Sequence, residues 1–221
     1  YGMSNLSNIE KSNVNFGKIA EYEGNNEDPD QNRFGHIPRN NNGEIIDNSG
    51  VTVGFGVDLG QQDENSLSGI SEETLKQVRP YFGKSRQEAA DFLKENPLEL
   101  SQEAIDELNN AAHMNDLKNI VNKFGNRFLS APEEAQTTVF SLVRNFGPEA
   151  LTYNTTKNVL DGNYEAAIEE LRNPMAWVGK KTDEEGNRIP EEVLQERART
   201  NPLNRRRGLE ADYLSRLINS Q

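Results

Sequence analysis

The amino-acid sequence predicts an α+β fold, in which a small β-hairpin sheet forms one lobe and a larger set of helices forms the other. Three observations predict it. One glycine-rich segment, residues 51–60, alternates strongly, as a strand does. A helical pattern precedes that segment, and almost every later segment has helical spacing with capping residues at its start. With sheet and helices in separate lobes, we expect a cleft between them.

The length of 221 residues is sufficient for one large domain or two small ones. Residues 1–12 are polar and rich in Asn and Ser, which predicts a linker or a frayed terminus. We expect residues 13–221 to form one domain. Within it, residues 13–66 should supply the first helix and the small sheet lobe, and residues 67–221 the helical lobe.

Composition excludes several classes of protein. Mean hydropathy is −0.84 and no stretch approaches the roughly 18 apolar residues of a membrane span, so we expect no membrane partner. The formal net charge of −12 argues against binding to nucleic acid, which requires clustered Lys and Arg. There is no cysteine, which excludes disulfides and thiolate metal sites. No classical signal peptide is visible at the start of the chain.

The first helix carries a candidate catalytic acid. Phe16, Ile19, Ala20 and Glu23 follow the spacing of one helix face, and Gly24 supplies a stop. A carboxyl group at the end of an apolar stripe is partly withdrawn from water, which favours its protonated form. Such a group can act as a general acid near neutral pH, as glycosidases require. The alternative is an ordinary exposed glutamate at a helix end.

The alternating segment carries two further candidates, Thr52 and Asp58. In an unbroken strand their side chains would lie about 20 Å apart, too far for one site. If Gly54 and Gly56 reverse the chain, the two residues become cross-strand neighbours within about 5 Å. We therefore predict a hairpin. The alternative is a glycine-containing hairpin without chemistry. A second turn, within 40–43, is predicted by Asn-Asn-Asn-Gly between apolar residues.

The rest of the chain reads as helix after helix. Apolar stripes at helical spacing predict two core faces, Ile105, Leu108 and Ala112 on one helix and Val139, Leu142, Val143 and Phe146 on another. Helix starts are predicted at Ser71 and at the capping boxes Ser85 to Glu88 and Ser130 to Glu133. The segment 180–187 is rich in charge and glycine, which predicts a surface loop.

Several motifs, in this order, resemble phage-type lysozymes. Glu23-Gly24 at a helix end, followed by Thr52-Val53-Gly54-Phe55-Gly56, resembles the Glu-Gly and Thr-[Ile/Val]-Gly-x-Gly pattern of that family. Residues 139–147 resemble its central core helix. Residues 164–167, with Leu171 and Trp177 further on, resemble its Trp-Asp-Glu-Ala-Ala region. Residues 204–211 resemble its C-terminal Arg-Arg-x-x-Glu helix. The resemblance spans about residues 14–218 and implies a lysozyme-like fold.

The subgroup most similar to this chain is the pesticin-type lysozymes, which are bacterial toxin and effector domains, some of them carried on type VI secretion spikes. Its catalytic set is a Glu, a Thr and an Asp six residues after the Thr, which matches Glu23, Thr52 and Asp58. Ordinary phage lysozymes place the Asp six residues before the Thr. That position is Ile46 here, and the nearest carboxylate, Asp47, is kept as a reserve.

The resemblance implies a peptidoglycan hydrolase, a muramidase that cleaves the β-1,4 bond between N-acetylmuramic acid and N-acetylglucosamine. Glu23 would be the acid, Asp58 would stabilise positive charge and orient the attacking water, and Thr52 would hold that water. It also implies an antibacterial toxin, secreted or delivered to the periplasm of a target bacterium. A non-catalytic peptidoglycan-binding module and a lytic transglycosylase are the alternatives.

Substrate contacts are expected from Tyr22 and Phe55, whose rings suit the apolar side of a sugar, and from the backbone at Gly54 and Gly56. No metal or cofactor is expected, and we expect a monomer. His36 shows no spacing typical of a triad or a zinc site.

An immunity protein that plugs the cleft is expected if the chain is an antibacterial effector. Residues 1–117 hold 9 Lys and Arg against 21 Asp and Glu, so its contacting surface should be basic. For the run Arg205-Arg206-Arg207, a solvated face with one structural salt bridge is favoured over contact with wall carboxylates.

Overall fold

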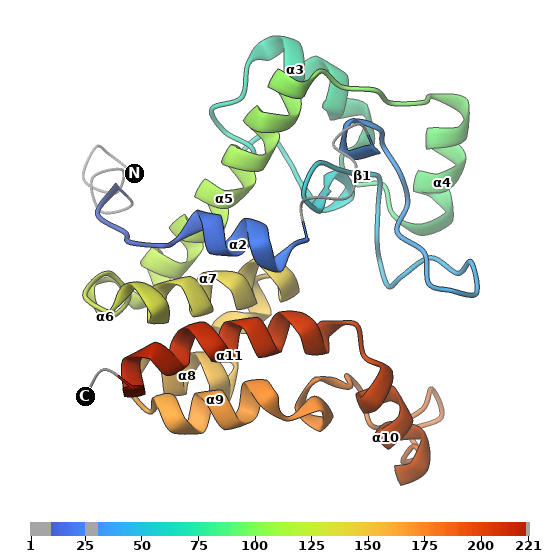
Figure 1. Ribbon diagram of the computed structural model, residues 1–221. Coiled ribbons are helices and arrows are strands. Elements are labelled where there is room, and N and C mark those ends of the chain that lie inside the picture. Colours follow the sequence, from blue (N-terminus) through green and yellow to red (C-terminus); the bar gives the residue numbers. More distant parts are fainter. Residues whose placement is uncertain (1–9, 25–30, 220–221) are drawn as a thin grey trace. The chain divides into compact units, whose positions relative to one another are not determined.

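A computed structural model of the chain describes residues 10–24 and 31–219 (Figure 1). The expected linker, residues 1–12, thus falls largely outside the described residues. The chain divides into two compact units, one formed by Tyr1–Glu23 with Lys118–Gln221 and the other by Gly24–Leu117. One boundary lies inside helix α5 (Gln102–Phe124). The division therefore differs from the one expected after residue 66.

The difference has a physical cause in the packing of the first helix, α2 (Phe16–Tyr22). Its N-cap residue, Asn15, donates its backbone N–H to Thr137 Oγ1 at 2.9 Å. Phe16 lies edge-on against Phe140, with 5.3 Å between ring centroids. Both partners belong to α7 (Glu133–Phe146), so α2 is part of the helical unit, although it precedes the sheet in the sequence.

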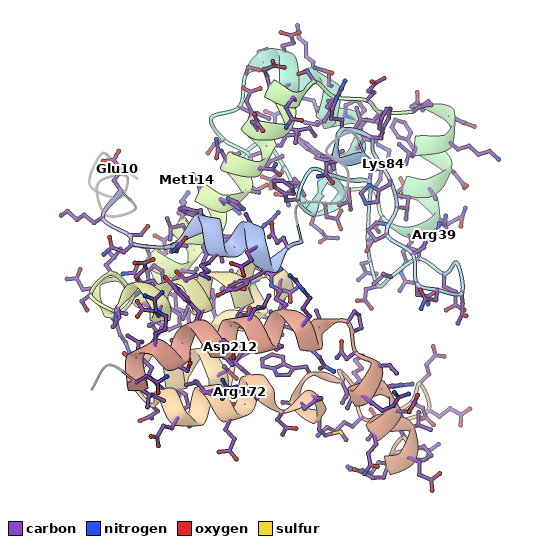
Figure 2. The ribbon with its side chains drawn as sticks, viewed as in Figure 1. Glu10, Arg39, Lys84, Met114, Arg172 and Asp212 are labelled. Carbon is purple, nitrogen blue, oxygen red and sulfur yellow. The ribbon has the colours of Figure 1, made fainter. Side chains whose placement is uncertain are left out.

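Helix α7 is the centre of the helical unit. Its residues 135–143 are all buried, which confirms the core stripe expected at Val139, Leu142 and Val143. Against it pack α8 (Asn154–Leu160) and α11 (Leu203–Asn219), and α9 (Tyr164–Arg172) packs in turn against both of these helices (Figure 1). The short α6 (Asn126–Leu129), η4 (Pro148–Thr152), η5 (Pro174–Trp177) and α10 (Glu191–Thr200) complete the described part of this unit. On the surface, Arg172 of α9 pairs with Asp212 of α11 at 3.0 Å (Figure 2).

The other unit holds the predicted sheet, which consists of β1 (Thr52–Val53) paired antiparallel with β2 (Val57–Asp58). Val51, Val53, Val57 and Leu59 are fully buried and share one core with the expected stripe of α5, in which Ile105 and Leu108 are buried. The helical elements of this unit are η1 (Gln31–Arg33), η2 (Leu59–Gln61), α3 (Glu72–Val78), η3 (Arg79–Tyr81), α4 (Arg86–Glu95) and the first part of α5. The α+β fold class, with a small sheet and many helices, is confirmed.

Bridges outside the named strands widen this small sheet. His36 pairs with Thr52, and Phe34 pairs with Glu99 on the other side of the same segment. Arg39 pairs with Ile45 around the expected turn, which Asn40 closes by donating its backbone N–H to Glu44 O at 2.9 Å. Residues 34–39 therefore form an extended segment between β1 and residues 98–100.

Two of the three expected helix starts are confirmed, those at Ser71 and Ser85. Ser71 caps α3, and its Oγ accepts the backbone N–H of Thr74. Ser85 is the N-cap residue of α4, although its side chain accepts no capping hydrogen bond. Ser130 is not the N-cap of α7, which begins three residues later, after Pro132. It is instead the C-cap residue of α6, and its hydroxyl donates back to Asn126 O in that helix. A search of the described residues finds no helix with the length and apolar character needed to cross a membrane.

Candidate active site

The predicted hairpin is confirmed, with Thr52 and Asp58 directly opposite each other on β1 and β2. Gly54 and Gly56 make the reversal, at φ values of +57° and +72° that residues with a side chain rarely adopt. Gly54 is required for a second reason. A Cβ placed there would lie 2.6 Å from Asn109 Oδ1, the atom that accepts the Phe55 N–H at 3.0 Å. Asn109 belongs to α5, so its contact with the hairpin cannot be predicted from the hairpin sequence.

The carboxylate of Asp58 is held by backbone amides. Its Oδ1 accepts the N–H of Gly60 at 2.9 Å and that of Gly50 at 3.1 Å, and its Oδ2 accepts the Gly50 N–H at 3.2 Å. Burial raises the pKa of Asp58 above its ordinary value, and these backbone hydrogen bonds partly oppose the rise. The structure therefore fixes the orientation of this carboxyl group and favours its uptake of a proton.

Two glycines make this arrangement sterically feasible. A Cβ on Gly50 would lie 2.5 Å from the carbonyl oxygen of Lys84 and 2.9 Å from Asp58 Oδ1. A Cβ on Gly60 would lie 2.2 Å from the same carbonyl oxygen. Only glycine lets the three backbone segments approach this closely. Sequence reasoning missed this role, because residues 50, 60 and 84 meet only in the folded unit.

Thr52 is buried, with 5% of its surface exposed. Its hydroxyl donates to the carbonyl oxygen of Gly50 at 3.2 Å. Because its one proton is engaged there, the oxygen of Thr52 offers only acceptor lone pairs to any further partner. Gly50 therefore orients both candidates. Its carbonyl oxygen accepts a hydrogen bond from the Thr52 hydroxyl, and its N–H donates to the Asp58 carboxylate.

Glu23 is the C-cap residue of α2, as its place before Gly24 predicts. Its side chain is 11% exposed, and its Oε1 lies 3.9 Å from Nε of Arg144, a residue of α7. Its buried Oε2 has no hydrogen-bond partner among the described residues. Burial raises the pKa of Glu23, and the positive charges of Arg144 and Arg206 partly offset that rise. The partly desolvated carboxyl group expected from the sequence is therefore present.

A cluster of largely buried charged residues lies in the same unit as Glu23, and one of them, Arg206, influences the pKa of Glu23. Arg206 of α11 donates to the carbonyl oxygen of Ser141 at 3.1 Å, and the hydroxyl of Ser141 donates to Glu210 Oε2. Glu210 is fully buried and pairs with Arg207, whose Nη2 donates to Glu210 Oε2 at 2.7 Å. These contacts join α7 to α11, the two helices that supply Arg144 and Arg206.

The run Arg205-Arg206-Arg207 is thus mostly structural, in line with the favoured expectation of a structural salt bridge. Arg207 is 1% exposed, and its guanidinium lies 4.9 Å from the ring of Phe146 and 5.1 Å from that of Trp177. Those two rings stack with centroids 5.5 Å apart. Arg205 alone of the three is exposed.

The expected substrate contacts differ in exposure. Tyr22 is 4% exposed, and the groups that influence its pKa all belong to the helical unit, so its ring packs in the interior. Tyr22 therefore offers little surface to a substrate in this structure. Phe55 is half-buried and Gly56 is exposed, whereas Gly54 is buried against Asn109. The reserve carboxylate, Asp47, is exposed and sits in a turn at φ +46°.

The structure thus brings Thr52 and Asp58 together within one unit, whereas Glu23 belongs to the other unit. Across residues 10–24 and 31–219, no group of three or more His, Asp or Glu side chains is placed to hold a metal ion. The carboxyl groups of Glu23 and Asp58 are of the kind that can transfer protons and orient water.

Glycoside hydrolases use a pair of carboxyl groups, of which the general acid has a raised pKa. The model of the Pesticin family, described as a bacterial toxin homologue of phage lysozyme, C-term, matches residues 13–165. This is more than half of the chain, which therefore belongs to that family. A search among curated proteins gives no match.

The matched region contains all three candidate catalytic residues, Glu23, Thr52 and Asp58. It ends at the start of α9, so the resemblance of residues 204–211 to the C-terminal lysozyme helix lies beyond it.

Proposed function

We propose that this chain is a muramidase, which hydrolyses the β-1,4 bond between N-acetylmuramic acid and N-acetylglucosamine in peptidoglycan. The observation that carries the proposal is the state of Glu23, a buried carboxyl group with a raised pKa inside the region matched by the Pesticin family. A general acid must still hold its proton near the working pH, and the burial of Glu23 shifts its pKa in that direction.

Glu23 is proposed as the group that protonates the leaving oxygen of the glycosidic bond. Its Oε1 faces Arg144, so the ionised form left after proton transfer is stabilised by a nearby positive charge. Its Oε2 accepts no hydrogen bond from a described residue and is the oxygen proposed to carry the proton. Arg144 thus tempers the rise in pKa caused by burial.

Asp58 and Thr52 are proposed to hold the attacking water. The Thr52 oxygen can only accept hydrogen bonds, because its own O–H donates to the carbonyl oxygen of Gly50. Asp58 Oδ2 accepts a single long hydrogen bond, from the Gly50 N–H. A water that donates one hydrogen to each of these oxygens turns a lone pair outward. That lone pair forms the new bond to the anomeric carbon while the glycosidic C–O bond breaks. The water's proton passes to Asp58, and the leaving oxygen takes the proton of Glu23.

We also propose that the chain acts outside the cell that makes it, as an antibacterial toxin domain secreted or delivered to a target periplasm. The family's description as a bacterial toxin homologue supports this setting. An immunity protein is proposed to block the site with a basic surface, since all of the net charge of −12 lies in residues 1–117. An equally tight inhibitor with an acidic contact surface would contradict that part of the proposal.

The test is mass spectrometry of soluble products after purified peptidoglycan is digested with the protein. Muropeptides with reducing ends at N-acetylmuramic acid are the expected result. Anhydro ends would show a lytic transglycosylase instead. If folded protein binds peptidoglycan and releases no product, the chain is a wall-binding module and the mechanism is wrong.

A further inference from the structure

The extended segment beside β1 presents two side chains away from the core. A Cβ on Gly35 would lie 2.9 Å from Val51 Cγ1, so this position faces the core, and Ile37 packs against the same core. Phe34 and His36 alternate with them and therefore point to the opposite face. Both are exposed, and 47% of the Phe34 surface is accessible.

That opposite face is the one that carries the candidate catalytic residues of the hairpin. His36 and Thr52 exchange both backbone hydrogen bonds, at 3.1 and 2.8 Å, and Thr52 is directly opposite Asp58 on its other side. Directly opposed residues in antiparallel strands place their side chains on the same face, about 4.5–5.5 Å apart at Cβ. The register therefore aligns His36, Thr52 and Asp58 in one row across three extended segments.

We propose that Phe34 and His36 form a glycan-binding subsite next to Thr52 and Asp58. This inference rests on the proposed function, because the glycan is the ligand that brings a sugar to Thr52 and Asp58. The ring of Phe34 offers an apolar face to the C–H face of a pyranose. The His36 Nδ1 lies 3.4 Å from the carbonyl oxygen of Phe34, which leaves Nε2 for a sugar hydroxyl or an acetamido group.

The occupant is one N-acetylated sugar unit of the glycan backbone. An aromatic ring beside a single imidazole supplies stacking and one directional hydrogen bond, which is the combination that a sugar ring requires. The subsite continues directly from Thr52 through the register of the sheet, so a glycan strand held at Asp58 extends onto His36.

The binding test uses Glu23→Gln protein, in which turnover is removed, and soluble uncrosslinked glycan strands as the probe in titration calorimetry. Phe34→Ala should raise the Kd about tenfold, and His36→Ala about three- to tenfold, as expected for one lost stacking contact and one lost hydrogen bond. Val193→Ala is the matched control, since Val193 is 43% exposed on α10, and should leave the Kd unchanged.

The kinetic test uses otherwise unchanged protein. Phe34→Ala and His36→Ala should raise KM and leave kcat nearly unchanged, because the contact is made equally before and during reaction. His36→Gln, which keeps a hydrogen-bonding group, should recover part of the affinity lost in His36→Ala. Phe34→Leu repeats the stacking test with a bulky aliphatic side chain if Phe34→Ala fails to fold.

The outcomes separate this inference from the proposed function. If the protein releases muropeptides and both variants keep the parent Kd and KM, the subsite does not exist and the muramidase proposal stands. If the protein releases no muropeptides while Phe34→Ala and His36→Ala still weaken glycan binding, the subsite is supported. The muramidase proposal is then wrong, and the chain is a glycan-binding module.

Discussion

Replacing Asp58 by Asn separates the chemistry of this residue from its structural role. The side chain caps η2, and its Oδ1 holds the amides of Gly50 and Gly60. An asparagine that places its carbonyl oxygen at the position of Oδ1 keeps both contacts, and Asn caps helices about as well as Asp. The change removes the charge and the basic oxygen Oδ2, together with the 3.2 Å hydrogen bond that Oδ2 accepts from the Gly50 N–H.

The expected magnitudes follow from these contacts. The hydrogen bonds from Gly50 and Gly60 change from a charged to a neutral acceptor, which costs about 1 kcal/mol each. The penalty of burying a charge disappears in return, and the raised pKa of Asp58 shows that this penalty outweighs the amide contacts. Because these two effects oppose each other, the free energy of unfolding should change by no more than about 1 kcal/mol. Turnover should fall about 10²- to 10⁴-fold, because the water loses its base.

Urea unfolding followed by circular dichroism measures the first quantity, and release of muropeptides from purified peptidoglycan measures the second. A loss of more than about 3 kcal/mol in the free energy of unfolding would show that Asp58 is chiefly a structural cap. Turnover within threefold of the parent would refute the proposed role in orienting water.

Two further substitutions test the surroundings of Glu23. Arg144→Gln removes a charge that lowers the pKa of Glu23, so the pKa rises further and the alkaline limb of the kcat/KM profile should move to higher pH. The exposed Arg188→Gln is the control, and an unchanged profile in Arg144→Gln would contradict the ion pair. Glu210→Gln leaves the buried Arg207 without its charged partner and should cost about 3–5 kcal/mol in urea unfolding. A loss below about 1 kcal/mol would show that the cluster does not hold α7 against α11.

Local sequence features predicted the hairpin and the position of Glu23. Gly54 and Gly56 between alternating residues leave a reversal as the arrangement that brings Thr52 to Asp58, and the structure shows that register. Gly24 ends α2 where the helical spacing predicts, so Glu23 is the cap. These features depend on the conformational preferences of a few neighbouring residues. They can therefore be predicted from a single sequence.

The surroundings of the site depend on contacts between distant segments. Asp58 is packed against Gly50, Gly60 and the carbonyl of Lys84, and Glu23 faces Arg144, which follows it by more than a hundred residues. No local pattern specifies such contacts, because they arise only when helices and loops pack. For the same reason the sequence alone groups the first helix with the sheet lobe, although in the structure it packs on α7.

The most direct test of the central claim compares Glu23→Gln with Glu21→Gln, two neutralising substitutions on the same short segment. Glu21 is exposed on α2, whereas Glu23 is buried at the end of that helix. Both proteins are incubated with purified peptidoglycan, and reducing-end muropeptides are counted by mass spectrometry. The account predicts parent-like release by Glu21→Gln and a loss of at least about 100-fold in folded Glu23→Gln. Equal release by both variants would contradict the assignment of Glu23 as the general acid.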